Sequence, residues 1–369
     1  MIIGIDASRA NNNQRTGVEE YAFQLIQNLK ILIPENIRVI LYTDKPLQNE
    51  LAELPMNWTQ KVLKWPPKRL WTQFRLSWEM FFNKPDVLFI PAHVAPIIHP
   101  QKTVMTIHDI AAVRFPKSYN WFERWYSIWS AKYAMKNLWK IIVPSKFVKT
   151  EIISILGTKN QEKIKVIYHG YNKNYQEKEN NKIILEKYNL PKAYLISVGR
   201  LEEKKNTVGI IQAFEKLKMF SGYEDLNLVL VGKPGFGYQK VKKIIENSLF
   251  KKEIIITGWV DEEDLPEIIK NAKIFVFPSF YEGFGLPILE AFTLEVPVIA
   301  SSNNCLKEIG EQGCLYIDPQ NIAEITETIH KLLNDSELRN KLIILGKERL
   351  NNFSWKKSAQ ETCELLLSK

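Results

Sequence analysis

Residues 279–291 read Ser-Phe-Tyr-Glu-Gly-Phe-Gly-Leu-Pro-Ile-Leu-Glu-Ala, and no other stretch of the 369-residue chain says as much about its fold. The stretch follows a short apolar run, Ile274–Phe277, which predicts a buried strand. Pro287 suits the first turn of a helix, because a residue at that position needs no N–H for helical hydrogen bonding. The segment therefore predicts a strand, a tight loop and a helix in succession.

Gly283 and Gly285 lie in the predicted loop, where glycine lets the backbone approach a ligand closely. The N-terminus of the following helix presents free N–H groups and the positive end of a dipole, which together suit an anion. Glu282 lies in the loop, and Glu290 falls one turn into the helix, where its carboxylate could reach a ribose hydroxyl. Acidic residues near a helix start contribute only a few tenths of a kcal/mol, and this effect does not account for two closely spaced glycines.

A second cluster, Gly199–Asn206, reads GRLEEKKN and also follows a predicted strand. Arg200 and Lys205 in such a loop can clamp a diphosphate and stabilise a leaving group that gains negative charge without a metal. A solvated charged turn is the alternative, and it would be preferred if this loop stood alone. The glycine-rich stretch 232–237 lacks the spacing of a P-loop or a dinucleotide fingerprint, so we expect it only to turn the chain.

Short β-branched runs alternate with amphipathic helical patterns, such as 208–219 and 322–333, in both halves of the chain. This alternation predicts a parallel sheet with helices on both faces, and it occurs twice. The predicted strands are Ile2–Asp6, Arg38–Tyr42, Val87–Ile90, Thr103–Ile107, Ile141–Val143, Tyr194–Val198, Leu226–Val231, Ile254–Thr257, Ile274–Phe277, Val298–Ala300 and Leu315–Ile317.

The glycine, histidine and charged residues that stand out follow the carboxyl ends of these predicted strands. Ligands of open parallel sheets bind outside those ends. Two such sheets with these edges facing each other would form a cleft between two domains. The residues concerned are Gly17, His93, His108, Asp109, Gly199, Arg200, Gly232, Gly258, Pro278 and Ser279.

The net charge of +9 is distributed unevenly. Residues 1–172 hold 23 Lys/Arg and 13 Asp/Glu, whereas the remainder holds 27 and 28, and eight of the ten tryptophans also lie in the first part. A basic, Trp-rich half suggests a partner of its own, and nucleic acid and an anionic membrane surface are both candidates. Basicity that only aids solubility is the alternative.

One predicted helix in this half carries tryptophan and lysine on a single stripe, because the residues lie three or four apart. Such a stripe suits the interfacial zone of an anionic membrane or an acceptor-binding face. The alternative is that the tryptophans pack in the core while the lysines reach outward. The residues of the stripe are Trp121, Trp125, Trp129, Lys132, Lys136 and Lys140.

The pair Glu282 and Glu290, with Gly-Phe-Gly-Leu-Pro between them, resembles the signature of the retaining nucleotide-sugar glycosyltransferases of family GT4, in its mannosyltransferase-like branch. The spacing of residues 199–206 is similar to the diphosphate loop of that family. Four further motifs stand in the order that the family shows, and they are Ile3–Ala7, Thr16–Val18, Thr106–Asp109 and Phe353–Trp355.

The resemblance implies a role for each matching residue. Arg200 and Lys205 would bind the donor diphosphate and stabilise its departure, Glu282 would face the donor sugar hydroxyls, and Glu290 would hold the ribose. His108 would line the sugar pocket. The remaining positions implied in donor binding are Gly17, Gly199, Gly258, Val260, Gly283, Phe284, Gly285 and Leu286.

The resemblance also implies the GT-B fold: an α/β protein with two Rossmann-like β/α/β domains facing across a cleft. The polar stretch 171–190 is the expected junction, which predicts an acceptor-binding domain over 1–172 and a nucleotide-sugar-binding domain over 173–354. The last helix, at about 355–369, is expected to cross back to the first domain.

The loop after Gly17 departs from the family pattern, because Val18-Glu19-Glu20 stands where a second glycine or an arginine is common. The carboxylates of Glu19 and Glu20 would be unfavourable if they pointed at a diphosphate. We expect Glu19 and Glu20 to begin the next helix instead, where they complement its dipole.

The resemblance leads us to expect GDP-mannose as the donor, or failing that a UDP-hexose. The expected acceptor is a glycan or a lipid-linked precursor of a surface polysaccharide.

The five histidines lack metal-ligand spacing, so no cofactor and no metal are predicted, and ordinary surface or turn roles are expected for His99, His169 and His330. Three cysteines without C-x-x-C spacing suit a reducing cytoplasm, and no apolar run reaches the ~18 residues of a membrane span. The rivals are a GT-B synthase or epimerase, a catalytically dead sugar-nucleotide binder and, more distantly, a basic nucleic-acid-binding protein.

Overall fold

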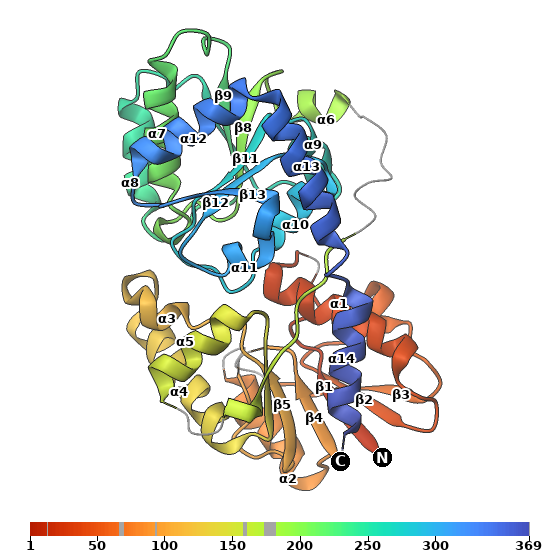
Figure 1. Ribbon diagram of the computed structural model, residues 1–369. Helices are drawn as coiled ribbons and strands as arrows, with labels where there is room; N and C mark the ends of the chain where they lie inside the picture. Colours follow the sequence, from red (N-terminus) through yellow and green to blue (C-terminus); the bar gives the residue numbers. More distant parts are fainter. Residues whose placement is uncertain (13, 66–69, 93, 158–160, 173–181, 369) are drawn as a thin grey trace. The chain divides into compact units, whose positions relative to one another are not determined.

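The computed structural model describes the chain apart from residues 13, 66–69, 93, 158–160, 173–181 and 369. Its residues divide into two compact units (Figure 1). The first unit comprises Met1–Arg114, Asn120–Gly170 and Phe353–Lys369, and the second comprises Phe115–Tyr119 and Tyr171–Asn352. His93, one of the expected site residues, lies outside the described part of the chain.

The first unit is built on a parallel sheet whose described strands number seven, in the order β3-β2-β1-β4-β5-β6-β7. The order reverses between β1 and β4, so the loops after these two strands diverge from a common point at the carboxyl edge of the sheet. The strands are β1 (Ile2–Asp6), β2 (Arg38–Thr43), β3 (Trp58–Val62), β4 (Val87–Ile90), β5 (Lys102–Thr106), β6 (Lys140–Val143) and β7 (Ile164–Val166).

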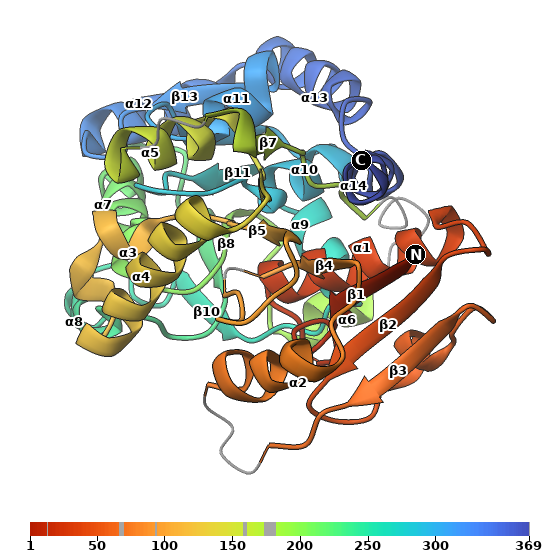
Figure 2. The same cartoon turned by 90° about the horizontal axis from the view of Figure 1, so that it is seen from below.

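Helices flank this sheet, and the last helix of the chain is one of them. Helix α14 (Trp355–Leu367) packs against α1 (Gly17–Leu32), and the two lie side by side in Figures 1 and 2. The expected return of the last helix to the first domain is therefore confirmed. The other helices of the unit are α2 (Ser77–Phe82), which continues η2 (Thr72–Leu76), α3 (Ala111–Arg114), α4 (Trp121–Asn137) and α5 (Lys146–Leu156), with short turns at η1 (Asn49–Ala52) and η4 (Gln161–Lys163).

The second unit repeats the architecture with strands in the order β10-β9-β8-β11-β12-β13, all parallel. Here the order reverses between β8 and β11. The strands are β8 (Tyr194–Val198), β9 (Asn227–Val231), β10 (Ile254–Gly258), β11 (Ile274–Phe277), β12 (Val298–Ser301) and β13 (Cys314–Ile317). The helices are α6 (Lys182–Lys187), α7 (Thr207–Lys218), α8 (Tyr238–Asn247), α9 (Leu265–Lys270), α10 (Leu286–Thr293), α11 (Leu306–Gly310), α12 (Ile322–Asn334) and α13 (Ser336–Leu350), with turns at η3 (Pro116–Ser118), η6 (Glu203–Lys205) and η7 (Glu311–Gly313).

The predicted α/β fold with two parallel sheets is confirmed, and each predicted strand is found within one or two residues of its expected bounds. Two strands, β3 and β7, were not predicted. Both are edge strands, and their residues alternate or face solvent (Trp-Thr-Gln-Lys-Val and Ile-Lys-Val). An edge strand need not be apolar on both sides, so it lacks the continuous run that marks a central strand of a parallel sheet.

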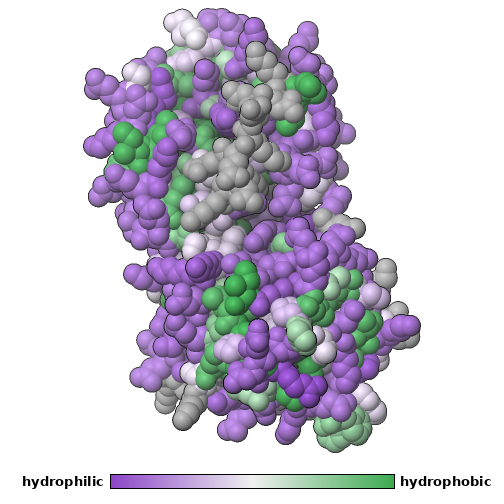
Figure 3. Space-filling view, turned by 90° about the vertical axis from the view of Figure 1, so that its right-hand side faces the viewer, coloured by the Kyte–Doolittle hydropathy of each residue, from purple (hydrophilic) through white to green (hydrophobic). Residues whose placement is uncertain are grey.

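Much of the molecular face seen in Figure 3 is hydrophilic, with hydrophobic side chains gathered in smaller patches. The apolar residues are instead concentrated inside each unit. In the second unit, helices α7 and α12 cover β8, β9 and β11, and Phe214, Ile211 and Ile325 are fully buried there.

Helix α13 packs very closely on α10 through glycine. A Cβ built on Gly346 would lie 2.6 Å from Cδ1 of the buried Phe292 ring, and a Cβ on Gly313 would lie 2.9 Å from the Cα of Gly346. Since real Cβ atoms do not approach carbon this closely, the glycines set how near α13 comes to the helix that carries the 279–291 motif.

We predict that Gly346→Ala destabilises the second unit, although alanine is the better helix former. The propensity gain of ~1 kcal/mol is outweighed by an overpacking cost of about 1–3 kcal/mol against Phe292. The measurement is the free energy of unfolding in urea. Asn340→Ala on the exposed side of α13 is the matched control and should change it by less than ~0.5 kcal/mol; an equal response of both variants would contradict the close packing.

Candidate functional site

The loop after β8, residues 199–206, is held in a conformation that needs glycine at its start. Gly199 has a φ of 145°, and the aliphatic chain of Lys205 lies over its Cα, within 3.5–3.9 Å of where a Cβ would stand. The loop ends at Asn206, whose side chain accepts from Gly209 N at 3.2 Å and donates to Pro319 O at 2.7 Å. This β8 loop is therefore anchored at both ends, with Arg200 and Lys205 between the anchors.

The glycine-rich loop after β9, residues 232–237, supports the β8 loop from behind. Gly199 N donates to Val231 O at 2.9 Å, and Leu201 N donates to Lys233 O at 3.0 Å. A Cβ on Gly232, which has a φ of 143°, would lie 2.0 Å from Gly199 O. The glycines of this loop thus permit close contact between two backbone segments.

The loop after β11, residues 278–285, leads into α10 as the sequence predicts. Gly285 is the N-cap residue with a φ of 103°, and Pro287 stands in the first turn. A Cβ on Gly285 would lie 2.5 Å from Leu306 Cδ2. The second glycine of the motif is therefore required both by its left-handed backbone and by the packing of α11 against this turn.

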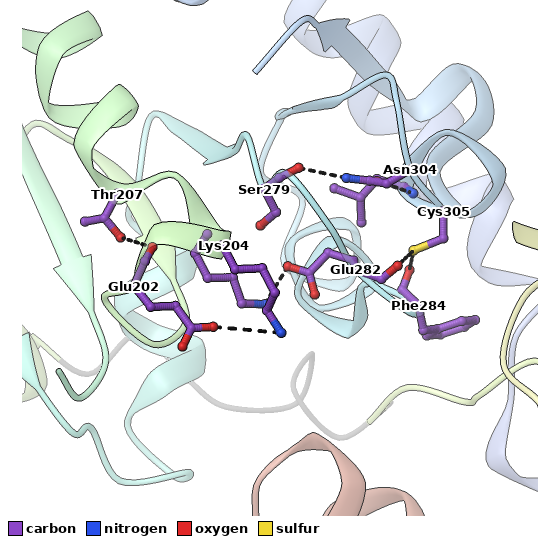
Figure 4. Close-up of polar contacts among 10 residues, drawn as sticks. Glu202, Lys204, Thr207, Ser279, Glu282, Phe284, Asn304 and Cys305 are labelled. Carbon is purple, nitrogen blue, oxygen red and sulfur yellow. Dashed lines mark hydrogen bonds and ion pairs between the residues drawn. The ribbon is translucent and has the colours of Figure 1, made fainter. Parts of the chain in front are cut away.

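Asn304 and Cys305, which follow β12, hold this β11 loop in place (Figure 4). Asn304 Nδ2 donates to Ser279 O at 2.7 Å. The Cys305 thiol lies 3.2 Å from both Glu282 O and Phe284 O, to which it donates. The sequence interpretation missed these two residues, although they follow a predicted strand and the strand-end rule applied to β12 would have found them.

The β8 loop and the β11 loop meet, because their strands are neighbours where the strand order reverses. Phe280 N donates to Lys204 O at 2.9 Å. Lys205 Nζ lies 2.5 Å from Glu282 Oε1 and 5.2 Å from the centroid of the Phe277 ring. Figure 4 shows Glu282 facing the loop of Lys204. The two motifs that the sequence singled out, 77 residues apart at this ion pair, form one cluster.

Several cations and carboxylates crowd this edge of the sheet. Glu202 lies 3.9 Å from Lys204, and Lys233 Nζ stands 4.4 Å above the Trp259 ring. Arg200 is exposed, and no described carboxylate forms an ion pair with it. The site thus holds one cation already paired with Glu282 and another, Arg200, open to solvent.

The remaining expected residues of the second unit lie at the same edge. Glu290 is partly buried in α10, one turn after its start. Gly258 has a φ of 72° at the end of β10 and accepts from Gly232 N at 2.9 Å, and Val260 is buried just beyond it. In open sheets the ligand site forms where the strand order reverses. Glu290 follows β11 at that point, whereas Gly258 and Val260 lie at the end of the outermost strand β10 and connect to that point through the loop after β9.

In the first unit, Gly17 is the first residue of α1 and is exposed. Glu19 and Glu20 lie in the first turn of that helix, as expected. The Glu19 carboxylate accepts from the N–H and hydroxyl of Thr16 at 2.8 and 2.9 Å, and Glu20 pairs with Arg15 at 2.8 Å. Both carboxylates are thus engaged within the helix start.

His108 is buried after β5, and its Nε2 lies 2.9 Å from Pro91 O. Its ring contacts Tyr21 edge-on at 4.8 Å between centroids, and the Tyr21 hydroxyl is bonded to Thr106 Oγ1 at 3.0 Å. The residue therefore sits in a rigid aromatic setting at the carboxyl end of its strand.

The expectation of a surface or turn role for His169 was wrong. The residue is buried, with ring centroids 4.5 Å from Tyr21, 5.5 Å from His108 and 5.9 Å from Trp355. Burial, and secondarily the charge of His108, holds its pKa well below the ordinary value. No local pattern marks this histidine, because its neighbours Tyr21, His108 and Trp355 come from three distant segments.

The tryptophan and lysine stripe of α4 lies on the outward side of the helix. Trp121 and Trp125 are 80% and 55% exposed, Trp129 is half-buried, and Lys132 and Lys136 are exposed. The residues that face the interior are Ser130, Ala131 and Ala134. Packing of Trp121 and Trp125 in the core, the alternative interpretation, is therefore excluded.

Family comparisons match both halves of the chain. Residues 177–349 match the family described as Glycosyl transferases group 1, and residues 15–175 match Glycosyltransferase Family 4. O-antigen chain mannosyltransferase B of Escherichia coli is 29% identical over 265 residues, which are 71% of this chain and 69% of that protein.

Solved structures share the fold over the full length. Sucrose-phosphate synthase from Thermosynechococcus elongatus has a TM-score of 0.77 at 18% identity, covering 99% of this chain and 98% of that one. Anabaena HepE in complex with UDP and glucose has a TM-score of 0.75 at 18% identity, covering 100% and 99%.

Two parallel sheets with flanking helices, each with a reversal of strand order, are the architecture that these solved structures share, which is the GT-B fold. With both halves matched, the chain belongs to glycosyltransferase family 4.

No described helix is both long and apolar enough to cross a bilayer. No group of three or more described His, Cys, Asp or Glu side chains is placed to hold a metal ion.

We predict that His169 makes the first unit lose stability in mild acid. Because the folded-state pKa of His169 lies below the unfolded value of about 6.5, the unfolded chain takes up the proton first as the pH falls. His169 therefore leaves the free energy of unfolding unchanged above pH ~6.5. Below that pH it lowers the free energy of unfolding by up to ~1.4 kcal/mol per pH unit. Urea unfolding at pH 7.5 and 5.5, followed by tryptophan fluorescence, measures it.

His169→Phe keeps an aromatic ring in the stack and cannot titrate, so its stability should depend less on pH over this interval. His330→Gln, which changes an exposed histidine of the second unit, is the control. An unchanged pH dependence in His169→Phe would contradict the assignment.

Proposed function

We propose that this glycosyltransferase moves a hexose, with mannose as the first choice, from a nucleoside diphosphate sugar to a glycan or a lipid-linked saccharide, with retention of configuration. The observation that supports the donor site most directly is the meeting of the β8 and β11 loops at the reversal of strand order. Cations, backbone N–H groups and carboxylates stand there together.

The cations of the β8 loop would bind the diphosphate. Arg200, which is exposed, is free to form bidentate hydrogen bonds with phosphate oxygens. Lys205 is held by Glu282 at 2.5 Å, and a diphosphate that arrives beside it would share its charge. As the bond to the sugar breaks, negative charge grows on the departing diphosphate, and positioned cations stabilise that change without reorganising.

The two carboxylates would bind hydroxyl groups on either side of the diphosphate. Glu282, on the β11 loop, is placed to accept hydrogen bonds from the sugar, and its ion pair with Lys205 orients the carboxylate. Glu290, one turn into α10, would accept from the ribose. Between them, the N–H groups of Phe284, Gly285 and Leu286 start the helix and suit the anion.

Retention would follow from attack on the face of the sugar that the diphosphate leaves. In that arrangement an oxygen of the departing phosphate accepts the proton of the acceptor hydroxyl, so the protein need not supply a base. His108, to which the family resemblance gives a place in the sugar pocket, is held by contacts with Pro91 O and Tyr21.

The choice of donor rests on a relative. The similar Escherichia coli protein is named a mannosyltransferase, which supports GDP-mannose. The HepE structure holds UDP and glucose, which keeps a UDP-hexose as the second candidate.

The same relative is named for the O-antigen chain, which supports a surface polysaccharide or its lipid-linked precursor as acceptor. We place the protein in the cytoplasm, with peripheral contact to an anionic membrane. Its three cysteines, all free and buried, suit a reducing compartment, and the exposed stripe of α4 supports the membrane contact. No nucleic acid is proposed as a partner.

We predict that one nucleoside diphosphate among GDP, UDP, ADP, dTDP and CDP raises the melting temperature in the absence of divalent metal, with GDP expected. A ligand at a hundredfold excess over Kd stabilises the folded state by about 2.7 kcal/mol. Lys205→Ala and Arg200→Ala should remove the shift and most of the turnover.

Lys242→Ala, an exposed lysine on α8 of the same unit, is the matched control and should keep the shift. Near-normal transfer by either Lys205→Ala or Arg200→Ala would contradict the diphosphate clamp. If none of the five nucleoside diphosphates raises the melting temperature, the proposed donor class is contradicted.

We predict that EDTA leaves transfer largely unchanged, because Arg200 and Lys205 supply the positive charge that a metal would otherwise provide. The measurement is the initial rate of sugar transfer with and without EDTA, followed by addition of Mg²⁺ or Mn²⁺. Complete loss that either ion restores would contradict the metal-free clamp.

A further inference from the structure

Helix α2 and the preceding η2 expose an aromatic face. Phe74, Trp78, Phe81 and Phe82 are each 54–64% exposed. They lie at i, i+4, i+7 and i+8, which is one side of a helix. The opposite side, with Gln73, Leu76, Ser77 and Met80, is buried. The inward side of this helical segment is packed, as in other surface helices. The outward side is apolar as well, although the outward side of a surface helix is usually polar.

A short segment joins this face to α4. Ile97 and Ile98 are half-exposed, and Ile97 N donates to Ser77 Oγ at 2.9 Å. The Tyr133 hydroxyl of α4 donates to Ile97 O at 2.7 Å. Helices α2 and α4 therefore flank the isoleucine segment, and both can be followed in Figure 2.

The outward side of α4 continues the apolar surface. Its rings stack along the helix, with centroids 6.2 Å apart between Trp125 and Trp129 and 5.3 Å between Trp129 and Tyr133. We call the combined set the aromatic surface. It consists of Phe74, Trp78, Phe81, Phe82, Ile97, Ile98, Trp121, Phe122 and Trp125.

The segment that carries this surface is rich in positive charge. Residues 61–140 contain 13 Lys/Arg and four Asp/Glu, an excess equal to the +9 of the whole chain. Of the four carboxylates, Glu79 is buried and paired with Lys61 and Arg75, and Glu123 caps α4. By contrast, Lys84, Arg124, Lys132 and Lys136 are exposed and form no ion pair with any residue that the structure describes.

We propose that the aromatic surface docks on an anionic lipid bilayer. This deepens the membrane contact of the proposed function and rests on it for its purpose, since a docked enzyme would meet a lipid-linked acceptor in the plane of the membrane. Large apolar patches of this kind mark interaction sites on soluble proteins. Tryptophan and phenylalanine enter the headgroup boundary, while lysine and arginine on the flanks attract anionic lipid.

The charge decides among the possible occupants. A second copy of the chain would bring the same excess of cations against itself, and like charges at an interface oppose association. A bilayer rich in acidic lipid offers both an apolar layer for the rings and negative charge for the lysines.

The test is sedimentation of the full chain with vesicles of phosphatidylcholine alone and of phosphatidylcholine with phosphatidylglycerol, at low and high salt. We expect binding to the anionic vesicles only, weakening as salt is raised. Lys132→Gln with Lys136→Gln should reduce binding about 25-fold, at about fivefold per charge. Trp78→Ser with Phe81→Ser should reduce it at least tenfold, even at low salt.

Matched variants of the second unit serve as controls. Leu249→Ser with Ile344→Ser removes exposed apolar side chains, and Lys251→Gln with Lys252→Gln removes exposed charge; both should bind as the native chain does. The melting shift with the nucleoside diphosphate, measured on all variants, separates the two proposals. Loss of vesicle binding with the shift intact supports docking, and vesicle binding without any shift would contradict the donor assignment alone.

Three results would overturn the docking proposal. One is equal binding to neutral and anionic vesicles at every salt concentration, or none to either. Another is equal loss in the control variants. The third is a concentration-dependent dimer, or a nucleic-acid complex, that the Trp78→Ser and Phe81→Ser changes abolish while vesicle binding stays absent.

Discussion

The ion pair between Lys205 and Glu282 is the contact on which the candidate site of the second unit depends. It joins the loop after β8 to the loop after β11, and the backbone bond from Phe280 N to Lys204 O secures the same junction. Both loops leave the sheet where the strand order reverses, which is the place where open parallel sheets bind ligands. Because the ion pair and the backbone bond fix the two charged loops against each other, a ligand that binds there need not order them at a cost in binding free energy.

The backbone around this pair is shaped by glycines that are needed for different reasons. Gly232 has a left-handed backbone and touches the carbonyl of Gly199, so it brings two loops together. Gly285 combines a left-handed φ with close packing against Leu306, so it positions the start of α10. Behind these, Asn304 and Cys305 bond to the carbonyls of the β11 loop. The charged residues are consequently carried by loops that are supported from the far side, which is the condition for electrostatic preorganisation.

The first unit has the same topology but a different chemical character. Its carboxyl edge carries His108 in a stack of aromatic rings that reaches Trp355 at the start of the returning helix. Its outer helices carry the aromatic surface, and residues 61–140 hold an excess of Lys/Arg over Asp/Glu equal to the net charge of the whole chain. Under the two proposals, one unit would bind the nucleotide, and the other would supply the surface that meets a large, anchored partner.

The sequence by itself determined the alternation of strands and helices, the position of nearly every central strand, and the two motifs at residues 199–206 and 279–291, because buried parallel strands are short apolar runs and because glycine and proline act locally. Only the tertiary structure decided that Lys205 reaches Glu282, that Asn304 and Cys305 hold the motif loop, that His169 is buried, and that Trp121 and Trp125 face outward. Each of these depends on which segments the strand order makes neighbours, and strand order is a long-range property. A helical stripe has the same spacing whether it faces the core or solvent, so the pattern of α4 could not settle its own direction; the packing of Ala131 and Ala134 on the other side did.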